Sequence, residues 1–103
     1  MNIFDTFMID IEFICMNINN KVEDLRNEIR SQTVDISTVA TIRYDINEYL
    51  HICRTARVGI ACQSFTAQQS DEIEAVIAHF SSEYELWNST LAMFDEVEVG
   101  EFN

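Results

Sequence analysis

Apolar residues recur every three or four positions along most of this chain, which is the spacing of the buried face of an α-helix. The first such stretch predicts a helix over residues 3–30. Asn17, Asn19 and Asn20 are weak helix formers, so a break in the helix at these residues is an alternative. Its expected buried face consists of Ile3, Phe7, Ile11, Ile14, Ile18, Val22, Leu25 and Ile29. Apolar and polar residues alternate over residues 9–13, so a short strand is the alternative structure for residues 3–16.

A second helix is predicted over residues 35–57, with Asp35 or Ser37 as its N-cap. Its apolar positions follow the three–four rhythm of a coiled-coil seam for three heptads. They are Val39, Ile42, Ile46, Tyr49, Cys53, Ala56 and Ile60. We expect Gly59 to end this helix, because glycine is the commonest residue just past a helix C-terminus.

A third helix is predicted over residues 66–94, where Thr66 and Gln69 have the spacing of a capping box. Its expected buried face is Ile73, Val76, Ile77, Phe80, Tyr84, Trp87, Leu91 and Phe94. The acidic tail over residues 95–103 is expected to fray or to form a short extended segment. The pattern thus predicts one all-α domain over residues 1–103, a three-helix bundle whose first and third helices are long.

Composition supports this fold class. The 103 residues include two glycines and no proline, whereas a β-sandwich or barrel needs turn residues at regular intervals. Hydrophobic residues make up 48% of the chain, which is too many for a disordered protein. The three cysteines, Cys15, Cys53 and Cys62, form no C-x-x-C pair and are predicted to be reduced core thiols. The first residues lack the pattern of a secretory leader, so we expect a cytoplasmic protein.

Charge is distributed unevenly along the chain. Residues 58–103 contain nine carboxylates and no lysine or arginine, and the formal net charge of the whole chain is −12. A surface of one sign repels nucleic acid and anionic membranes but attracts basic protein surfaces. We therefore expect a protein partner, with no direct contact to nucleic acid or to a membrane.

The carboxylates of the third predicted helix form rows. Glu74, Glu85 and Glu96 fall on one line, and Glu72 and Glu83 fall on another. Rows of carboxylates on a rigid helix can replace phosphates in the basic channel of a nuclease or another nucleic-acid-binding effector. The predicted partner-binding residues are Glu72, Glu74, Glu83, Glu85, Asp95, Glu96 and Glu98. The alternative is a solvated face that is acidic for solubility.

The back of the first predicted helix is also apolar. Ile9, Phe13 and Met16 lie at i, i+4 and i+7, opposite the main apolar face. A helix with two apolar faces is either central in its bundle or pairs with another chain. We expect a homodimer, and the alternatives are a further protein partner and burial within the chain. Two functions are alternatives to the binding of a basic partner. The chain would be a self-associating assembly protein, or a helical oligomer that binds a ligand near Phe13, Tyr49 and Trp87.

No catalytic motif emerges from the sequence. Glu48 and His51 have the Glu-x-x-His spacing of di-iron bundles, but such a site needs a second copy of the motif and further inward glutamates. The cysteines and histidines match no structural zinc pattern, and two glycines cannot make a phosphate-binding loop. We expect no enzyme activity, no metal and no cofactor.

In size, acidity and lack of catalytic machinery, the chain resembles phage-encoded antagonists of bacterial defence, such as anti-restriction and anti-CRISPR proteins. The resemblance is one of composition, and no motif of a named family carries functional residues over to this chain. It implies a small inhibitor or adaptor that binds its target stoichiometrically in the host cytoplasm, as a DNA mimic.

Overall fold

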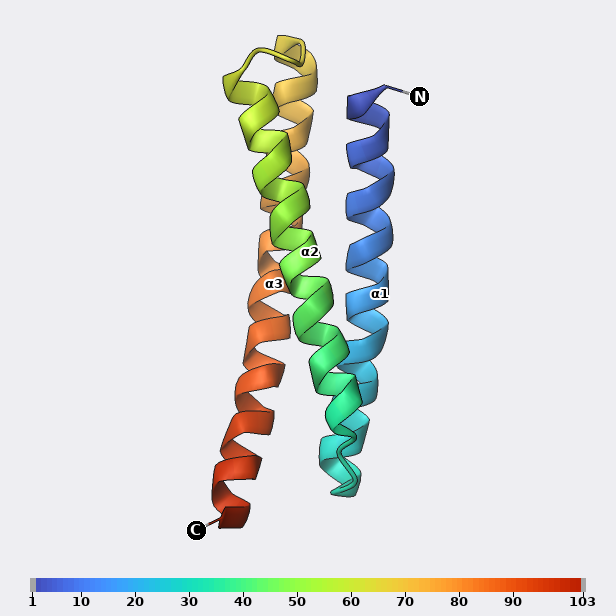
Figure 1. Ribbon diagram of the computed structural model, residues 1–103, viewed down its shortest axis with the longest axis vertical. Coiled ribbons are helices and arrows are strands. Elements are labelled where there is room, and N and C mark those ends of the chain that lie inside the picture. The colour runs from blue at the N-terminus through green and yellow to red at the C-terminus, as the bar shows by residue number, and fades with distance from the viewer. Residues whose placement is uncertain (1, 103) are drawn as a thin grey trace.

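The computed structural model describes the backbone of residues 2–102 and the side chains of residues 2–95. It contains three helices, α1 (Ile3–Ser31), α2 (Ile36–Ala61) and α3 (Ala67–Phe102), and residues 2–102 contain no strand (Figure 1). The predicted all-α fold with three helices is confirmed. The alternative strand near the start of the chain is wrong, because buried side chains recur there with the helical period.

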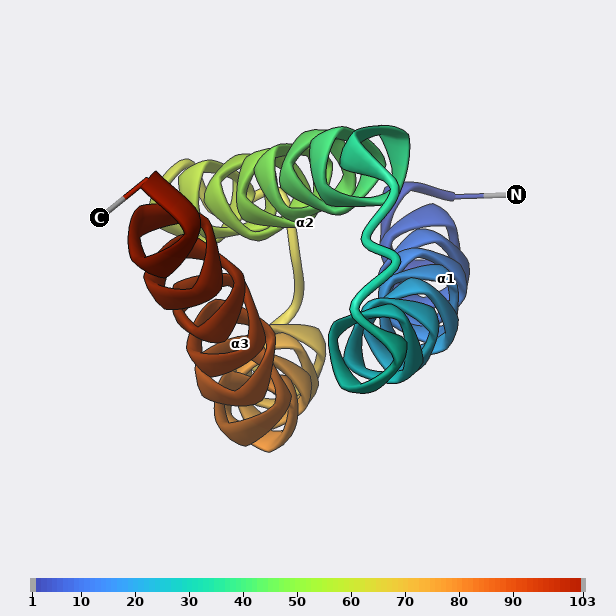
Figure 2. The same ribbon diagram turned by 90° about the horizontal axis from the view of Figure 1, so that it is seen from below.

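The three helices form an elongated body of 53 × 23 × 18 Å. α1 and α3 run in the same direction and α2 runs opposite to both, so that the helices occupy the corners of a triangle when viewed end-on (Figure 2). Apolar side chains from all three helices meet in one core, including Ile18 of α1, Tyr49 of α2 and Trp87 of α3.

Two predicted helix starts are confirmed in atomic detail. Asp35 caps α2, since its Oδ1 accepts a hydrogen bond of 2.9 Å from the backbone N–H of Ser37. Thr66 and Gln69 form the capping box of α3, in which each side chain accepts a hydrogen bond from the other residue's backbone N–H, at 3.0 and 3.1 Å. Polar residues at these positions therefore define where both helices begin.

The predicted end of α2 at Gly59 is wrong. The helix continues to Ala61, and the backbone then turns at Gln63, which has a positive φ of 59°. Gly59 is needed for packing instead, because a Cβ atom at this position would lie 2.5 Å from Cε2 of Phe65. The glycine lets the ring of Phe65 lie directly on the helix backbone.

The predicted end of the third helix is also wrong, since α3 extends through the acidic segment to Phe102. The side chains of residues 96–103, including Glu96 and Glu98, lie outside the described residues. The predicted buried face of α2 is confirmed apart from Ile60, which is half-buried. On α1, Ile14 and Ile29 are likewise half-buried, and the prediction fails at Ile3, which is 68% exposed in the first turn.

Candidate protein-binding site

The carboxylates predicted to bind a partner lie in different environments along α3. Glu74 and Asp95 face α2 and make ion pairs with Arg57 at 3.8 Å and with Arg43 at 3.1 Å. All four side chains are more than half exposed, so these pairs contribute little to stability. They nevertheless place positive charge beside two of the predicted carboxylates, which the spacing of residues within one helix could not reveal.

Glu83 points towards the interior rather than into solvent. It is half-buried, and its Oε1 accepts a hydrogen bond of 3.3 Å from Nδ2 of Asn19 on α1. Its Oε2 is buried and has no hydrogen-bond partner among the described residues. Glu72 and Glu85 are exposed and have no cation within ion-pair distance in the described part of the chain. The five predicted carboxylates whose side chains are described thus lie in three environments: Glu74 and Asp95 are paired with arginines of α2, Glu83 is half-buried, and Glu72 and Glu85 are exposed.

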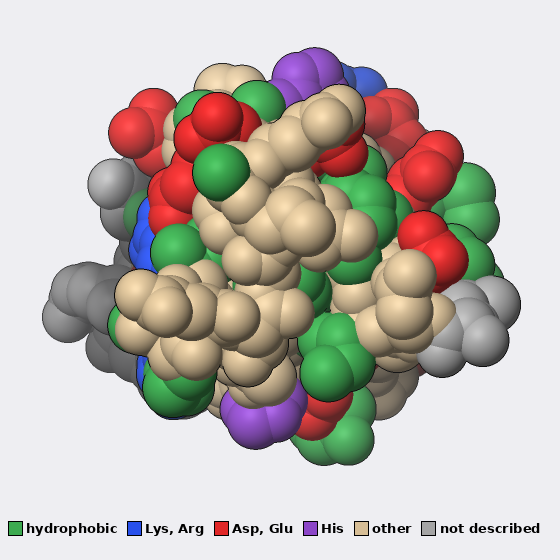
Figure 3. Space-filling view, turned by 90° about the horizontal axis from the view of Figure 1, so that it is seen from above, with side chains coloured by type: hydrophobic (Ala, Val, Ile, Leu, Met, Phe, Trp, Pro, Cys, Tyr) green, Lys and Arg blue, Asp and Glu red, His purple; other side chains and the backbone are tan. Residues whose placement is uncertain are grey.

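Two neighbouring helix segments contain no basic residue. Neither residues 3–20 of α1 nor any position of α3 is lysine or arginine. Because α1 and α3 run side by side in the same direction, their first halves form a face to which neither helix contributes a basic side chain (Figure 1). Viewed from the end that carries the α2–α3 loop, the surface shows hydrophobic side chains between carboxylates and few basic side chains (Figure 3).

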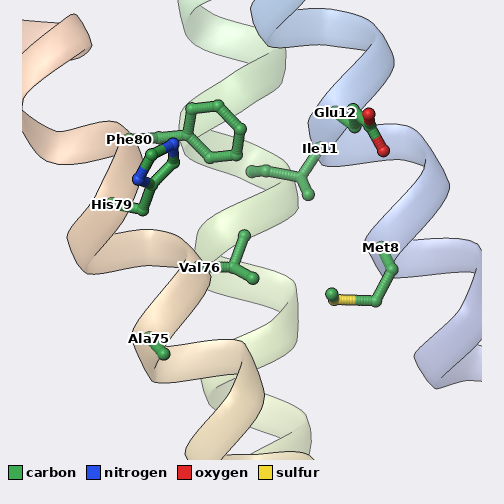
Figure 4. Close-up of a pocket in the computed structure, with 7 residues that line it drawn as sticks. All are labelled: Met8, Ile11, Glu12, Ala75, Val76, His79 and Phe80. Carbon is green, nitrogen blue, oxygen red and sulfur yellow. The ribbon is translucent and has the colours of Figure 1, made fainter.

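A groove of about 330 Å³ opens between α1 and α3 on this face (Figure 4). It is lined by Met8, Ile11, Glu12, Ala75, Val76, His79 and Phe80. Its floor is apolar, with Ile11 of α1 and Phe80 of α3 pointing towards each other, and Glu12 stands at its edge. The ring of His79 lies edge-on to that of Phe80, with the ring centroids 5.0 Å apart. Periodicity within one helix could not predict this groove, because the groove depends on how the two helices are placed relative to each other.

A second groove, of about 410 Å³, lies between the start of α1 and the end of α2. Its walls include Phe7, Ile52 and Phe65, and Asp10 and His51 are among its polar lining residues. Like the α1–α3 groove, which has Glu12 and His79, this groove is therefore lined by one carboxylate and one histidine.

The three residues predicted to drive self-association are exposed to solvent. Ile9, Phe13 and Met16 are 53%, 60% and 53% exposed, on the side of α1 that faces away from α2 and α3. Intrachain burial, the alternative for this face, does not occur. The homodimer itself stays a prediction.

The interior around Tyr49 is filled by aromatic rings. Tyr49 packs against Trp87 with the ring centroids 5.1 Å apart and against Tyr84 at 5.8 Å. Burial raises the pKa of the Tyr49 hydroxyl, and the neighbouring Cys53 adds to this shift. Phe13 lies at the surface, so the predicted ligand pocket near Phe13, Tyr49 and Trp87 is not formed by these residues.

The cysteines differ in exposure. Cys15 and Cys53 are buried as predicted, but the prediction is wrong for Cys62, which is exposed because it lies at the C-cap of α2. Burial, the nearby Glu83 carboxylate and Cys53 raise the pKa of the Cys15 thiol to about 12, which disfavours the reactive thiolate. His51 is exposed. Among the described residues, no group of three or more histidine, cysteine or acidic side chains is placed to hold a metal ion.

Comparisons with known proteins add no assignment. No protein-family model, no curated protein and no solved structure matches the chain. Within the described part of the chain, no helix combines the length and the apolar character needed to cross a membrane. The function therefore has to be inferred from the surface and the grooves described above.

Proposed function

We propose that the protein is a small acidic inhibitor or adaptor that binds a basic protein surface in a fixed stoichiometry. The observation that supports this most is the distribution of charge on the folded chain. Among the described residues, ion pairs involve Asp45, Glu74 and Asp95, and the other carboxylates have no cation within 4.0 Å. Self-repulsion of this kind costs stability, and a complementary basic partner would relieve it.

The most concrete form of this function is mimicry of nucleic-acid charge. Glu74 and Glu85 are eleven residues apart on one helix, roughly 16 Å along its axis at 1.5 Å per residue. Carboxylates fixed on such a rod would contact the lysines and arginines that line the substrate channel of a nuclease or another nucleic-acid-binding effector. Occupation of the channel would exclude the real substrate. The compositional resemblance to phage-encoded anti-defence proteins agrees with this mechanism and would place it in the host cytoplasm.

The proposal is tested by charge reversal at the two carboxylates that are exposed and unpaired among the described residues. The double variant Glu72→Lys/Glu85→Lys is compared with Glu23→Lys/Glu48→Lys, which makes the same change in net charge at exposed positions of α1 and α2. The partner is isolated from host lysate with the parent protein, and its affinity for each variant is then measured with purified components.

We expect the α3 variant to weaken binding at least about tenfold and the control to have a much smaller effect. Binding of the parent should also weaken between about 50 and about 500 mM NaCl, because salt screens exposed charges. Equal losses in the two variants, or binding that salt does not change, would contradict the proposal. A partner that has no nucleic-acid channel would contradict mimicry while leaving the binding function intact.

A second candidate function, assembly by self-association, is favoured by the exposed row of Ile9, Phe13 and Met16. Full burial of such a side chain contributes about 1.5–3 kcal/mol, so burying the exposed half in a symmetric dimer contributes about 1 kcal/mol per side chain. The six side chains of a dimer thus supply about 6 kcal/mol against an association cost of about 4–15 kcal/mol. We expect at most a weak dimer.

Sedimentation equilibrium distinguishes this candidate. The variant Ile9→Gln/Phe13→Gln/Met16→Gln should be monomeric at every protein concentration at which the parent is dimeric. Because carboxylates flank the row, salt should strengthen self-association, whereas it should weaken binding to a basic partner. A parent that stays monomeric at millimolar concentration and high salt would refute the assembly function.

A further inference from the structure

We infer that the α1–α3 groove receives an apolar anchor side chain from a basic amphipathic segment of the partner. The occupant is a short helix that carries one aliphatic or aromatic side chain with lysine or arginine a turn away on either side. This inference rests on the proposed function and adds the chemistry of the partner that the groove would recognise.

The floor of the groove leaves apolar surface uncovered. Met8, Val76 and Phe80 are half-buried, although Ile11 beneath them is 1% exposed. In Figure 4, Met8 and Ile11 approach from α1, and Val76 and Phe80 approach from α3. The space of about 330 Å³ between them lies at the small end of ligand pockets, which suits a single side chain. Covering this surface is favourable for any apolar group of suitable size.

The edges of the groove select the charge of the occupant. Glu12 lines the groove and is exposed. Asp5 lies three residues before Met8, and Glu72 lies three residues before Ala75, so each shares a helix face with a residue of the groove. All three carboxylates lack a cation partner among the described residues. An apolar anchor with cations one turn to either side is therefore the complementary ligand.

The aromatic pair at the groove strengthens the preference for a cation. Phe80 and His79 lie edge to face with their ring centroids 5.0 Å apart, and they line the groove from α3, across from Glu12 and Met8 of α1. A guanidinium or ammonium group that approaches Glu12 can also contact the face of an aromatic ring, and the stem of an arginine or lysine covers apolar surface.

A second copy of this chain is a poor occupant by the same reasoning. Its exposed hydrophobic row on α1, around Phe13, is accompanied by Asp10 and Glu12, which would meet the carboxylates of the groove. Of its six basic residues, Lys21, Arg43 and Arg57 are already in ion pairs. Like charges across an interface oppose binding, so the partner is expected to be a different and basic protein.

The test uses two helix-forming peptides of about 15 residues with equal numbers of lysines. One carries leucines along a single face, and the other carries glutamines at the same positions. Affinities for the parent protein are measured by fluorescence anisotropy, and the bound site is mapped by NMR shifts of Met8, Ile11 and Ala75. We expect the leucine peptide to bind at least about tenfold more tightly and to shift the signals of the groove.

Two matched pairs of variants then separate the groove from general charge attraction. Ala75→Trp fills the groove, whereas Ala78→Trp adds the same side chain at an exposed position of α3 that does not line it. Glu12→Lys and Glu48→Lys make the same change in net charge at the groove and on α2. Circular dichroism confirms that each variant is folded. We expect at least about tenfold weaker binding of the leucine peptide to the groove variants and less than about twofold change for the controls.

Three results would each overturn the inference. They are equal binding of the two peptides, equal effects of the paired variants, and NMR shifts confined to Ile9, Phe13 and Met16. The proposed function fails in a different way. If the partner isolated from lysate binds Ala75→Trp with full affinity yet loses affinity for Glu72→Lys/Glu85→Lys, the groove inference is refuted and the binding function stands. If the partner loses affinity for Ala75→Trp as well as for Glu72→Lys/Glu85→Lys, the result supports the groove as the anchor site.

Discussion

Asn19 of α1 holds two side chains of α3, and its replacement tests how the two long helices are joined. Its Oδ1 accepts a hydrogen bond of 2.7 Å from Nε1 of Trp87, and its Nδ2 donates one of 3.3 Å to Glu83. Trp87 is 0% exposed, so its N–H cannot turn to bulk water if the acceptor is lost. The variant Asn19→Ala removes that acceptor without adding bulk to the core.

The expected size of the effect follows from two opposing terms. A buried donor that is left without a partner costs about 1–3 kcal/mol. Alanine is a better helix former than asparagine by about 0.5 kcal/mol, which offsets part of this cost. Glu83 is half-exposed and can turn towards solvent, so its lost hydrogen bond adds little. We expect Asn19→Ala to lower the free energy of unfolding by about 1–2 kcal/mol.

Urea unfolding followed by circular dichroism measures this change, with Asn20→Ala as the matched control. Asn20 is exposed on the same helix, so its replacement has the same effect on helix propensity but removes no buried partner. The control should be neutral or slightly stabilising. A double-mutant cycle between Asn19→Ala and Trp87→Phe should show a coupling energy of about 1 kcal/mol. If the two alanine variants have the same stability, the hydrogen bond to Trp87 does not contribute as argued.

Two further predictions concern the buried thiols. In the native protein Cys62 should react with a thiol reagent at neutral pH, whereas Cys15 and Cys53 should react only after unfolding; fast reaction of all three would contradict their burial. The folded state raises the pKa of Cys15 from 9.0 to about 12, so it keeps a proton that the unfolded chain loses. Stability should therefore fall as the pH rises from about 9 to about 12. The decline should be shallower in Cys15→Ala than in Cys62→Ala, and equal slopes would refute the assignment.

The sequence was sufficient to predict those features that depend on neighbours within one helix. The spacing of apolar residues identified the buried face of α2, and hydrogen-bonding side chains identified the capping residues Asp35 and Thr66. Gly59 was misread because its role depends on Phe65, which packs on it from beyond the end of the helix. The inward turn of Glu83 was missed because its partner, Asn19, is 64 residues away.

The same limit applies to the candidate site. The sequence shows directly that α3 has no basic residue of its own. Spacing within one helix could not show that Arg43 and Arg57 of α2 approach Asp95 and Glu74. It also could not show the groove, whose residues come from two helices. Contacts between helices depend on crossing angle and register, which a periodic pattern leaves open.

The position of the cations bears on whether the acidity serves only solubility. Carboxylates anywhere on the surface would keep the chain soluble, and their placement relative to apolar surface would then be immaterial. In the folded protein, Arg43 and Arg57 of α2 lie beside carboxylates on the α2 side of α3, whereas the first halves of α1 and α3 contain no basic residue. The groove opens on that second side, with Glu12 at its edge. Negative charge therefore coincides with uncovered apolar surface, a combination that solubility does not require and that recognition of a basic amphipathic segment does.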